Sequence, residues 1–141
     1  MARPGLCFPD GRPQSLPLRR CALRPMVYRQ LPFLKFWEKY NRAYLMEGED
    51  LSAPVEIEFC TGSFSAVRTA EFKAVGGFDE HYFMYVEDAD LTRRCAPPAK
   101  PTSAAVHRHP CMASCGPPQP QAFLWQTGSL LRYFHKWGFK F

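Results

Sequence analysis

Proline placement is the feature that most constrains what this chain of 141 residues can fold into. Seven of its 14 prolines lie within residues 96–121, and six lie within residues 1–32. Proline cannot donate a backbone hydrogen bond, and it breaks helices and central strands. We therefore expect an extended basic arm over residues 1–32, a folded part over 33–95, an irregular Pro/Cys-rich segment over 96–121 and a helix over 122–141.

The acidic side chains are concentrated in one part of the chain. Residues 38–90 hold twelve of the thirteen acids, whereas the sequence from Leu91 onward has seven bases and no acid. Acid–base or metal chemistry is therefore expected within residues 38–90. The basic flanks suit phosphorylated ligands or an anionic membrane surface, although a solvated surface explains the N-terminal arm better.

Neither a membrane span nor a secretory signal is evident. No stretch approaches the roughly 20 apolar residues that cross a bilayer, and the N-terminus lacks the apolar centre of a signal peptide. We expect a cytoplasmic protein whose six cysteines are free thiols.

Two stretches have apolar residues at helical spacing. The first, residues 33–44, carries an aromatic stripe that we expect in the core: Phe33, Phe36, Trp37, Tyr40 and Tyr44. The second, residues 123–137, predicts a basic amphipathic helix. Its expected apolar face is formed by Leu130, Leu131, Phe134 and Trp137. Between the two helices, the alternation Val-Glu-Ile-Glu-Phe over residues 55–59 predicts a half-buried strand.

The most informative motif is GGFDEHYFMYVEDADLTRR, residues 76–94. It resembles the family-2 glycosyltransferase signature G-G-F-D-E-x-F/Y-F-x-Y-x-E-D-x-D-L-x-x-R. Three more stretches are similar to motifs of that family, in the family's order: FPDGRPQSLPLRR (8–20), EFCTGSFSAV (58–67) and SLLRYFHKWG (129–138). The resemblance, closest to rhamnosyltransferase-like members, implies an α/β protein with a partial GT-A fold. It would hold the acceptor-side half, with the nucleotide-binding half missing.

The resemblance also assigns roles to the acidic pair Glu87-Asp88 within the motif of residues 76–94. Asp88 becomes the candidate general base, which takes the proton of an acceptor hydroxyl during inverting sugar transfer. Glu87 would orient Asp88 or contact the acceptor. Without the resemblance, both acids would simply begin a helix, because the unpaired amides of a helix N-terminus stabilise carboxylates.

Four further residues are candidates for the walls of the site. By the resemblance, Asp79 and Glu80 shape the acceptor site from a loop. Gly62 and Ser63 follow the predicted strand, and their backbone would line the donor or acceptor pocket. A bulge between two strands explains Gly62 and Ser63 about equally well.

Asp88-Ala89-Asp90 has the D-x-D form of the family's metal-binding motif. In the family that motif closes a strand of the nucleotide-binding half, whereas Asp90 is expected a few residues into a helix. We expect Asp90 to pair with Arg94 instead, one helical turn onward.

Two histidines and two cysteines lie within nine residues: His107, His109, Cys111 and Cys115. By the resemblance, His107 or His109 falls near a family histidine that binds metal or diphosphate. A zinc site is the alternative, but the spacing is tight for two ligand pairs on separate elements. A third hypothesis explains the composition best: a pair of compensating reading-frame shifts over residues 96–121, which resequencing the gene would test.

Taken together, the sequence predicts part of an inverting glycosyltransferase, inactive alone, that acts with a nucleotide-sugar donor and a glycan or lipid-linked acceptor. The complete enzyme is expected to use Mg²⁺ or Mn²⁺. The C-terminal helix either docks on the rest of the enzyme or lies on the inner face of a membrane. Nucleic-acid binding is not expected. The alternative is a small non-enzymatic protein that binds zinc or an anionic surface.

Overall fold

The computed structural model describes residues 1–8, 10–12, 19–31, 33–50, 55–95, 102–110 and 120–139. Their elements are, in chain order, β1 (Ala2–Cys7), α1 (Leu23–Gln30), the 3-10 turn η1 (Lys35–Trp37), α2 (Glu38–Tyr44), β2 (Val55–Ile57), α3 (Thr69–Ala74), α4 (Glu87–Cys95), β3 (Thr102–Pro110) and α5 (Pro120–Trp137). The architecture is mixed α/β, as the sequence predicted.

The three strands form one sheet in the order β1-β3-β2. The central strand β3 runs parallel to β1, with Ala2 opposite Ser103, and antiparallel to β2, with Ile57 opposite Thr102. The register of β1 shifts between Pro4 and Leu6. Because β3 joins the first residues of the chain to the strand at 55–57, the sheet depends on contacts between distant parts of the sequence.

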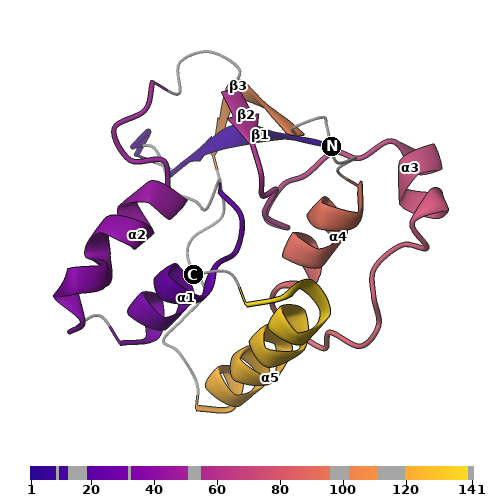
Figure 1. Ribbon diagram of the computed structural model, residues 1–141. Coiled ribbons are helices and arrows are strands. Elements are labelled where there is room, and N and C mark those ends of the chain that lie inside the picture. Colours follow the sequence, from indigo (N-terminus) through magenta and orange to yellow (C-terminus); the bar gives the residue numbers. More distant parts are fainter. Residues whose placement is uncertain are drawn as a thin grey trace.

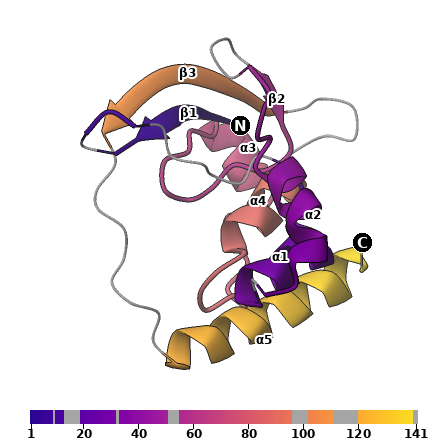
Figure 2. The ribbon, with the colours of Figure 1, turned by 90° about the vertical axis from the view of Figure 1, so that its left-hand side faces the viewer.

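The helices cover one side of this sheet. Figures 1 and 2 show α4 between the sheet and α5, with α1 and α2 beside them. The main core lies where these helices meet the chain that leaves β2, and its buried members are Cys21, Met26, Tyr44, Phe59, Tyr82, Ala89, Tyr133 and Phe134. Since Tyr133 and Phe134 belong to α5, the last helix completes the core, which favours docking over a helix that lies free of the fold.

Two segments contain secondary structure that the sequence did not predict. The arm of residues 1–32, expected to be extended, holds the strand β1 but also the helix α1, so the expectation is wrong for Leu23–Gln30. The segment of residues 96–121, expected to be irregular, contains the central strand β3 at 102–110, so the expectation is wrong there too. Pro25 is tolerated because it lies in the first turn of α1, where a backbone N–H would lack an intrahelical partner. Residues 102–109 contain no proline, and Pro110 falls at the strand's end.

The aromatic stripe of residues 33–44 is only partly buried. Tyr44 belongs to the core, but Phe33 is 72% exposed and Phe36 65% exposed, so the prediction of a buried stripe fails for these two. The regular helix begins at Glu38, after the 3-10 turn. The rings at 33 and 36 therefore do not follow the same helical face as Tyr44.

Candidate functional site

Asp88 lies at the start of α4, half-buried, where the chain leaving β2 passes that helix. Its Oδ2 accepts a hydrogen bond from the Gly62 amide over 2.7 Å, and its Oδ1 accepts one from the Ala89 amide over 2.8 Å. The structure thus brings together Gly62 and Asp88, two predicted site residues that lie 26 positions apart.

Burial raises the pKa of Asp88 above its ordinary value. The Gly62 amide opposes this change by bonding to the charged form, and the neighbouring charge of Glu87 adds to it. A general base works best when its pKa lies near the working pH, and an ordinary aspartate has a pKa of about 3.9. The pKa of Asp88 is therefore displaced in the direction that proton abstraction near neutral pH requires.

Glu87 lies beside Asp88 at the first position of α4. Its Oε2 is buried and has no hydrogen-bond partner within the described part of the chain. Buried polar atoms are rarely left without a partner. Glu87 therefore has hydrogen-bonding capacity that the described residues do not use.

Gly62 and Ser63 are exposed and lie in a turn, not in a bulge between paired strands. A Cβ added at Gly62 would lie 3.6 Å from Cβ and Oδ2 of Asp88, an ordinary van der Waals contact. Close approach therefore does not require glycine at this position. What Gly62 contributes is its backbone N–H.

The turn before α4 has an unusual backbone. Tyr85 has a φ of 68° and Val86 a φ of 58°, and bulky or β-branched residues rarely adopt the left-handed region. Such conformations cost about 1–3 kcal/mol each and persist where the surroundings hold them. Val86 packs against the core, and the Met84 carbonyl accepts a hydrogen bond from Ser129 Oγ over 2.7 Å. This held turn sets the start of the helix that carries Glu87 and Asp88.

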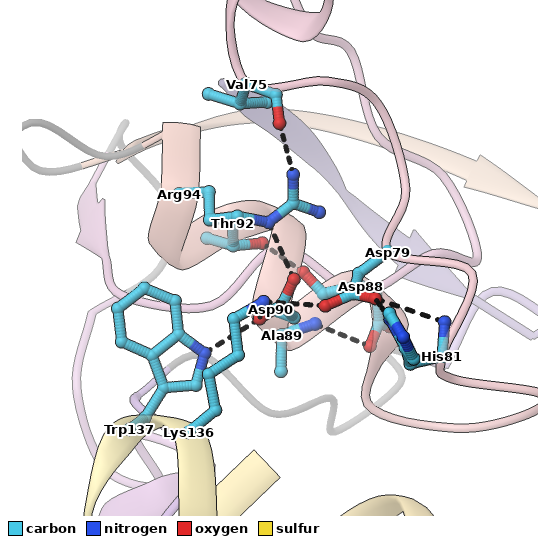
Figure 3. A network of polar contacts seen from close by, with 10 residues as sticks. All are labelled: Val75, Asp79, His81, Asp88, Ala89, Asp90, Thr92, Arg94, Lys136 and Trp137. Atoms are coloured by element: carbon cyan, nitrogen blue, oxygen red, sulfur yellow. Dashed lines mark hydrogen bonds and ion pairs between the residues drawn. The ribbon is translucent and has the colours of Figure 1, made fainter. Parts of the chain in front are cut away.

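Asp90 serves the structure of the site rather than metal binding. It is fully buried, and its carboxylate contacts three donors (Figure 3): Arg94 Nε at 2.7 Å, Lys136 Nζ at 2.9 Å and Trp137 Nε1 at 2.8 Å. The predicted pairing with Arg94 is confirmed. Because α5 supplies the other two donors, Asp90 joins α4 to α5.

Asp79 and Glu80 lie on the loop before α4, in different surroundings. Lys136 Nζ lies 2.7 Å from Asp79 Oδ2, while the backbone and ring nitrogens of His81 lie 3.1 Å and 2.7 Å from its Oδ1. The bonds from Lys136 and then His81 hold the pKa of Asp79 well below its usual range. Asp79 therefore tethers the loop to α5, and Glu80 is exposed.

The acids in the described part of the chain do not form a ready-made metal cluster. Within the described residues there is no group of three or more His, Cys, Asp or Glu side chains arranged to hold a metal ion. Asp90 already faces three donors, so the D-x-D pattern offers no metal site here. The backbone of His107 lies in β3, but its side chain falls outside the description, as do Cys111 and Cys115.

Two residues that organise the site were missed as site residues from the sequence: Lys136 and Trp137. The sequence places Trp137 on the apolar face of its helix, and its pattern gives no separate role to Lys136. The one available signal was Asp90 itself, because a buried carboxylate accepts several hydrogen bonds and Arg94 alone does not supply them.

No helix in the described ranges is long and apolar enough to cross a membrane.

No family model matches the chain, and no solved structure matches it. Two curated bacterial enzymes do match part of it. Rhamnosyltransferase WbbL of Escherichia coli is 46% identical over 46 residues, which are 33% of this chain and 17% of that enzyme. N-acetylglucosaminyl-diphospho-decaprenol L-rhamnosyltransferase of Mycobacterium tuberculosis is 45% identical over 62 residues, 42% of this chain and 20% of that enzyme.

The matched stretches span a fifth or less of the relatives' length. The similarity supports a glycosyltransferase-type relationship for this chain.

Proposed function

We propose that the chain supplies the acceptor side of an inverting glycosyltransferase, which moves a sugar from a nucleotide-sugar donor to a hydroxyl acceptor. The observation that carries the proposal is the Asp88 carboxylate, half-buried between the Gly62 amide and the start of α4, with a raised pKa. The partial identity to two rhamnosyltransferases supports the choice of reaction.

In this mechanism Asp88 acts as the general base. It accepts the proton of the acceptor hydroxyl while the hydroxyl oxygen forms a bond to the anomeric carbon. The bond from that carbon to the diphosphate breaks, and the nucleoside diphosphate leaves with the bonding electrons. Glu87, whose Oε2 has no hydrogen-bond partner among the described residues, would hold the acceptor. The described residues form no ready-made metal cluster, so we assign no step to a metal.

The acceptor we propose is a glycan or a lipid-linked sugar at the inner face of a membrane. One relative is named for transfer to N-acetylglucosaminyl-diphospho-decaprenol, an acceptor with a lipid tail. On the loop that precedes α4, the exposed ring of Phe83 packs edge-on against Trp125 of α5, with 5.0 Å between ring centroids. Exposed aromatic side chains of this kind suit the boundary of a lipid layer.

A graft tests the role of Asp88. Residues 55–95 would replace the matching segment of the Mycobacterium tuberculosis enzyme, and rhamnosyl transfer would be measured with and without Asp88→Asn. Loss of a general base lowers the rate by about 10²–10⁴-fold. Lys73→Ala, an exposed change on α3, is the matched control and should leave the rate unchanged. An active graft that tolerates Asp88→Asn would overturn the proposal.

A further inference from the structure

Thr92 lies one helical turn after Asp88 and is completely buried. Its Oγ1 lies 3.2 Å from the Cys60 amide, from which it accepts a hydrogen bond, and 2.7 Å from the Asp88 carbonyl, to which it donates. Figure 3 shows Thr92 on the same helix as Asp88 and Asp90. The hydroxyl therefore connects the backbone of α4 to the chain that leaves β2.

Two hydrogen bonds join the segment at residues 60–62 to side chains that lie one turn apart on α4. The Cys60 amide bonds to Thr92 and the Gly62 amide bonds to Asp88. Two residues of chain span at most about 7 Å, and four residues of α-helix advance about 6 Å. The Cys60 and Gly62 amides can therefore both bond to side chains one helical turn apart, as they do at Thr92 and Asp88.

A third contact supports the same segment. Between the two amides lies Thr61, which is buried, and its Oγ1 accepts a hydrogen bond from Arg3 Nη1 over 2.8 Å. Arg3 comes from β1 and is itself buried. The segment at 60–62 is therefore fastened both to α4 and to β1, although residues 60 and 61 belong to no helix or strand.

We propose that Thr92 is a positioning residue, whose hydroxyl holds the segment 60–62 against α4 so that the Gly62 amide binds the Asp88 carboxylate. The positioning contact itself does not depend on the proposed function. Its importance for catalysis does rest on the proposed role of Asp88 as the general base. The hydroxyl is what matters, because valine has nearly the same shape but cannot accept the bond from Cys60. Serine keeps the hydroxyl and loses only a methyl group.

The experiment follows the Gly62 amide proton by NMR during a pH titration of the 141-residue chain. In the unchanged protein and in Thr92→Ser, its chemical shift should follow the ionisation of Asp88. In Thr92→Val that response should be lost, and the Cys60 amide should exchange with solvent roughly tenfold faster, as expected for one lost hydrogen bond. A Gly62 response that survives in a folded Thr92→Val variant overturns the proposal.

A second measurement keeps the proposal testable if the Thr92→Val variant does not fold. In the unchanged protein and in Thr92→Ser, the Cys60 amide must then be protected from exchange; an unprotected Cys60 amide overturns the proposal. Because these readouts need no turnover, they stay separate from the graft assay. The Gly62 response could be lost in Thr92→Val while the graft stays active with Asp88→Asn. That combination would refute the role of Asp88 as the general base and would keep the positioning role of Thr92.

Discussion

Trp137 donates its indole N–H to Oδ1 of Asp90 over 2.8 Å and thereby ties the last turn of α5 to the first turn of α4. The same ring lies 4.3 Å from the guanidinium carbon of Arg93. Helix α5 is therefore held to the candidate site by a specific polar contact as well as by core packing. The site depends on the C-terminus of the chain even though its acids lie between residues 79 and 90.

Replacing Trp137 by phenylalanine tests that contact. The change keeps an aromatic ring beside Arg93 and removes the donor to Asp90. Hydrogen bonds to charged groups contribute about 1.5–3 kcal/mol, so we expect the free energy of unfolding in urea to fall by roughly that amount. Leu131→Ala, at a side chain of α5 that is 59% exposed, is the comparison and should change stability much less. Equal losses from both changes would mean that the indole N–H adds little.

The tether between Asp79 and Lys136 predicts a pH dependence of stability. The pKa of Asp79 is lower in the folded chain than in the unfolded chain, first because of Lys136 and then because of His81. Its contribution is therefore complete above the unfolded pKa of about 3.9 and is lost as the pH falls toward the folded value. Asp79→Asn should be less stable than the unchanged protein at pH 7, and the difference should narrow below pH 4.

Urea unfolding at pH 7 and at pH 3 measures this difference. Glu80→Gln is the matched control, because Glu80 is the exposed neighbour of Asp79 on the same loop. The contrary result is a difference in free energy of unfolding between Asp79→Asn and the unchanged protein that is the same at pH 7 and pH 3. That result would show that the tether does not titrate as described.

The left-handed backbone at Tyr85 predicts a reversed preference between glycine and alanine. At ordinary positions alanine stabilises a protein relative to glycine, because glycine has more freedom to lose on folding. At a φ of 68° the Cβ of alanine is disfavoured by about 1–2 kcal/mol. We therefore expect Tyr85→Gly to unfold at a higher temperature than Tyr85→Ala. The same pair at Glu80, which does not have a positive φ, should show the opposite order.

Patterns between neighbouring residues were enough to predict that a helix begins at the acids of α4 and that Asp90 pairs with Arg94. These features depend on residues within one or two helical turns of each other. The strand at 55–57 and the C-terminal helix followed in the same way from their apolar spacing.

Other features depend on contacts between distant residues, which no local pattern contains. Strand β3 pairs with residues 2–7, about a hundred positions earlier, and nothing in its composition indicates that partner. On α5 the predicted face was nearly right, but Leu131 is 59% exposed while Tyr133 is buried. Apolar residues lie on most sides of that helix, so only the position of α4 and α1 decides which of them are buried. The Gly62–Asp88 contact likewise required the fold.

The thiols at Cys21 and Cys60 offer a test of whether this core forms in the isolated chain. Both are buried and free, and burial raises the pKa of Cys21 to about 12 and that of Cys60 to about 11. Only the thiolate reacts with iodoacetamide, so at pH 8 roughly one thousandth of Cys60 thiols would be reactive even with full access. We expect Cys95, which is only half-buried, to be alkylated before Cys21 and Cys60 in the native chain.

Mass spectrometry of alkylated peptides over time measures the order of reaction. In urea Cys21, Cys60 and Cys95 should react at similar rates, because unfolding removes the burial that distinguishes them. Thr92→Ser serves as the variant control, since it keeps the contact to the Cys60 amide and should keep the protection of its thiol. If Cys21 and Cys60 react as fast in buffer as in urea, the helices do not close over the end of β2, and the carboxylate of Asp88 is then not held in the surroundings that raise its pKa.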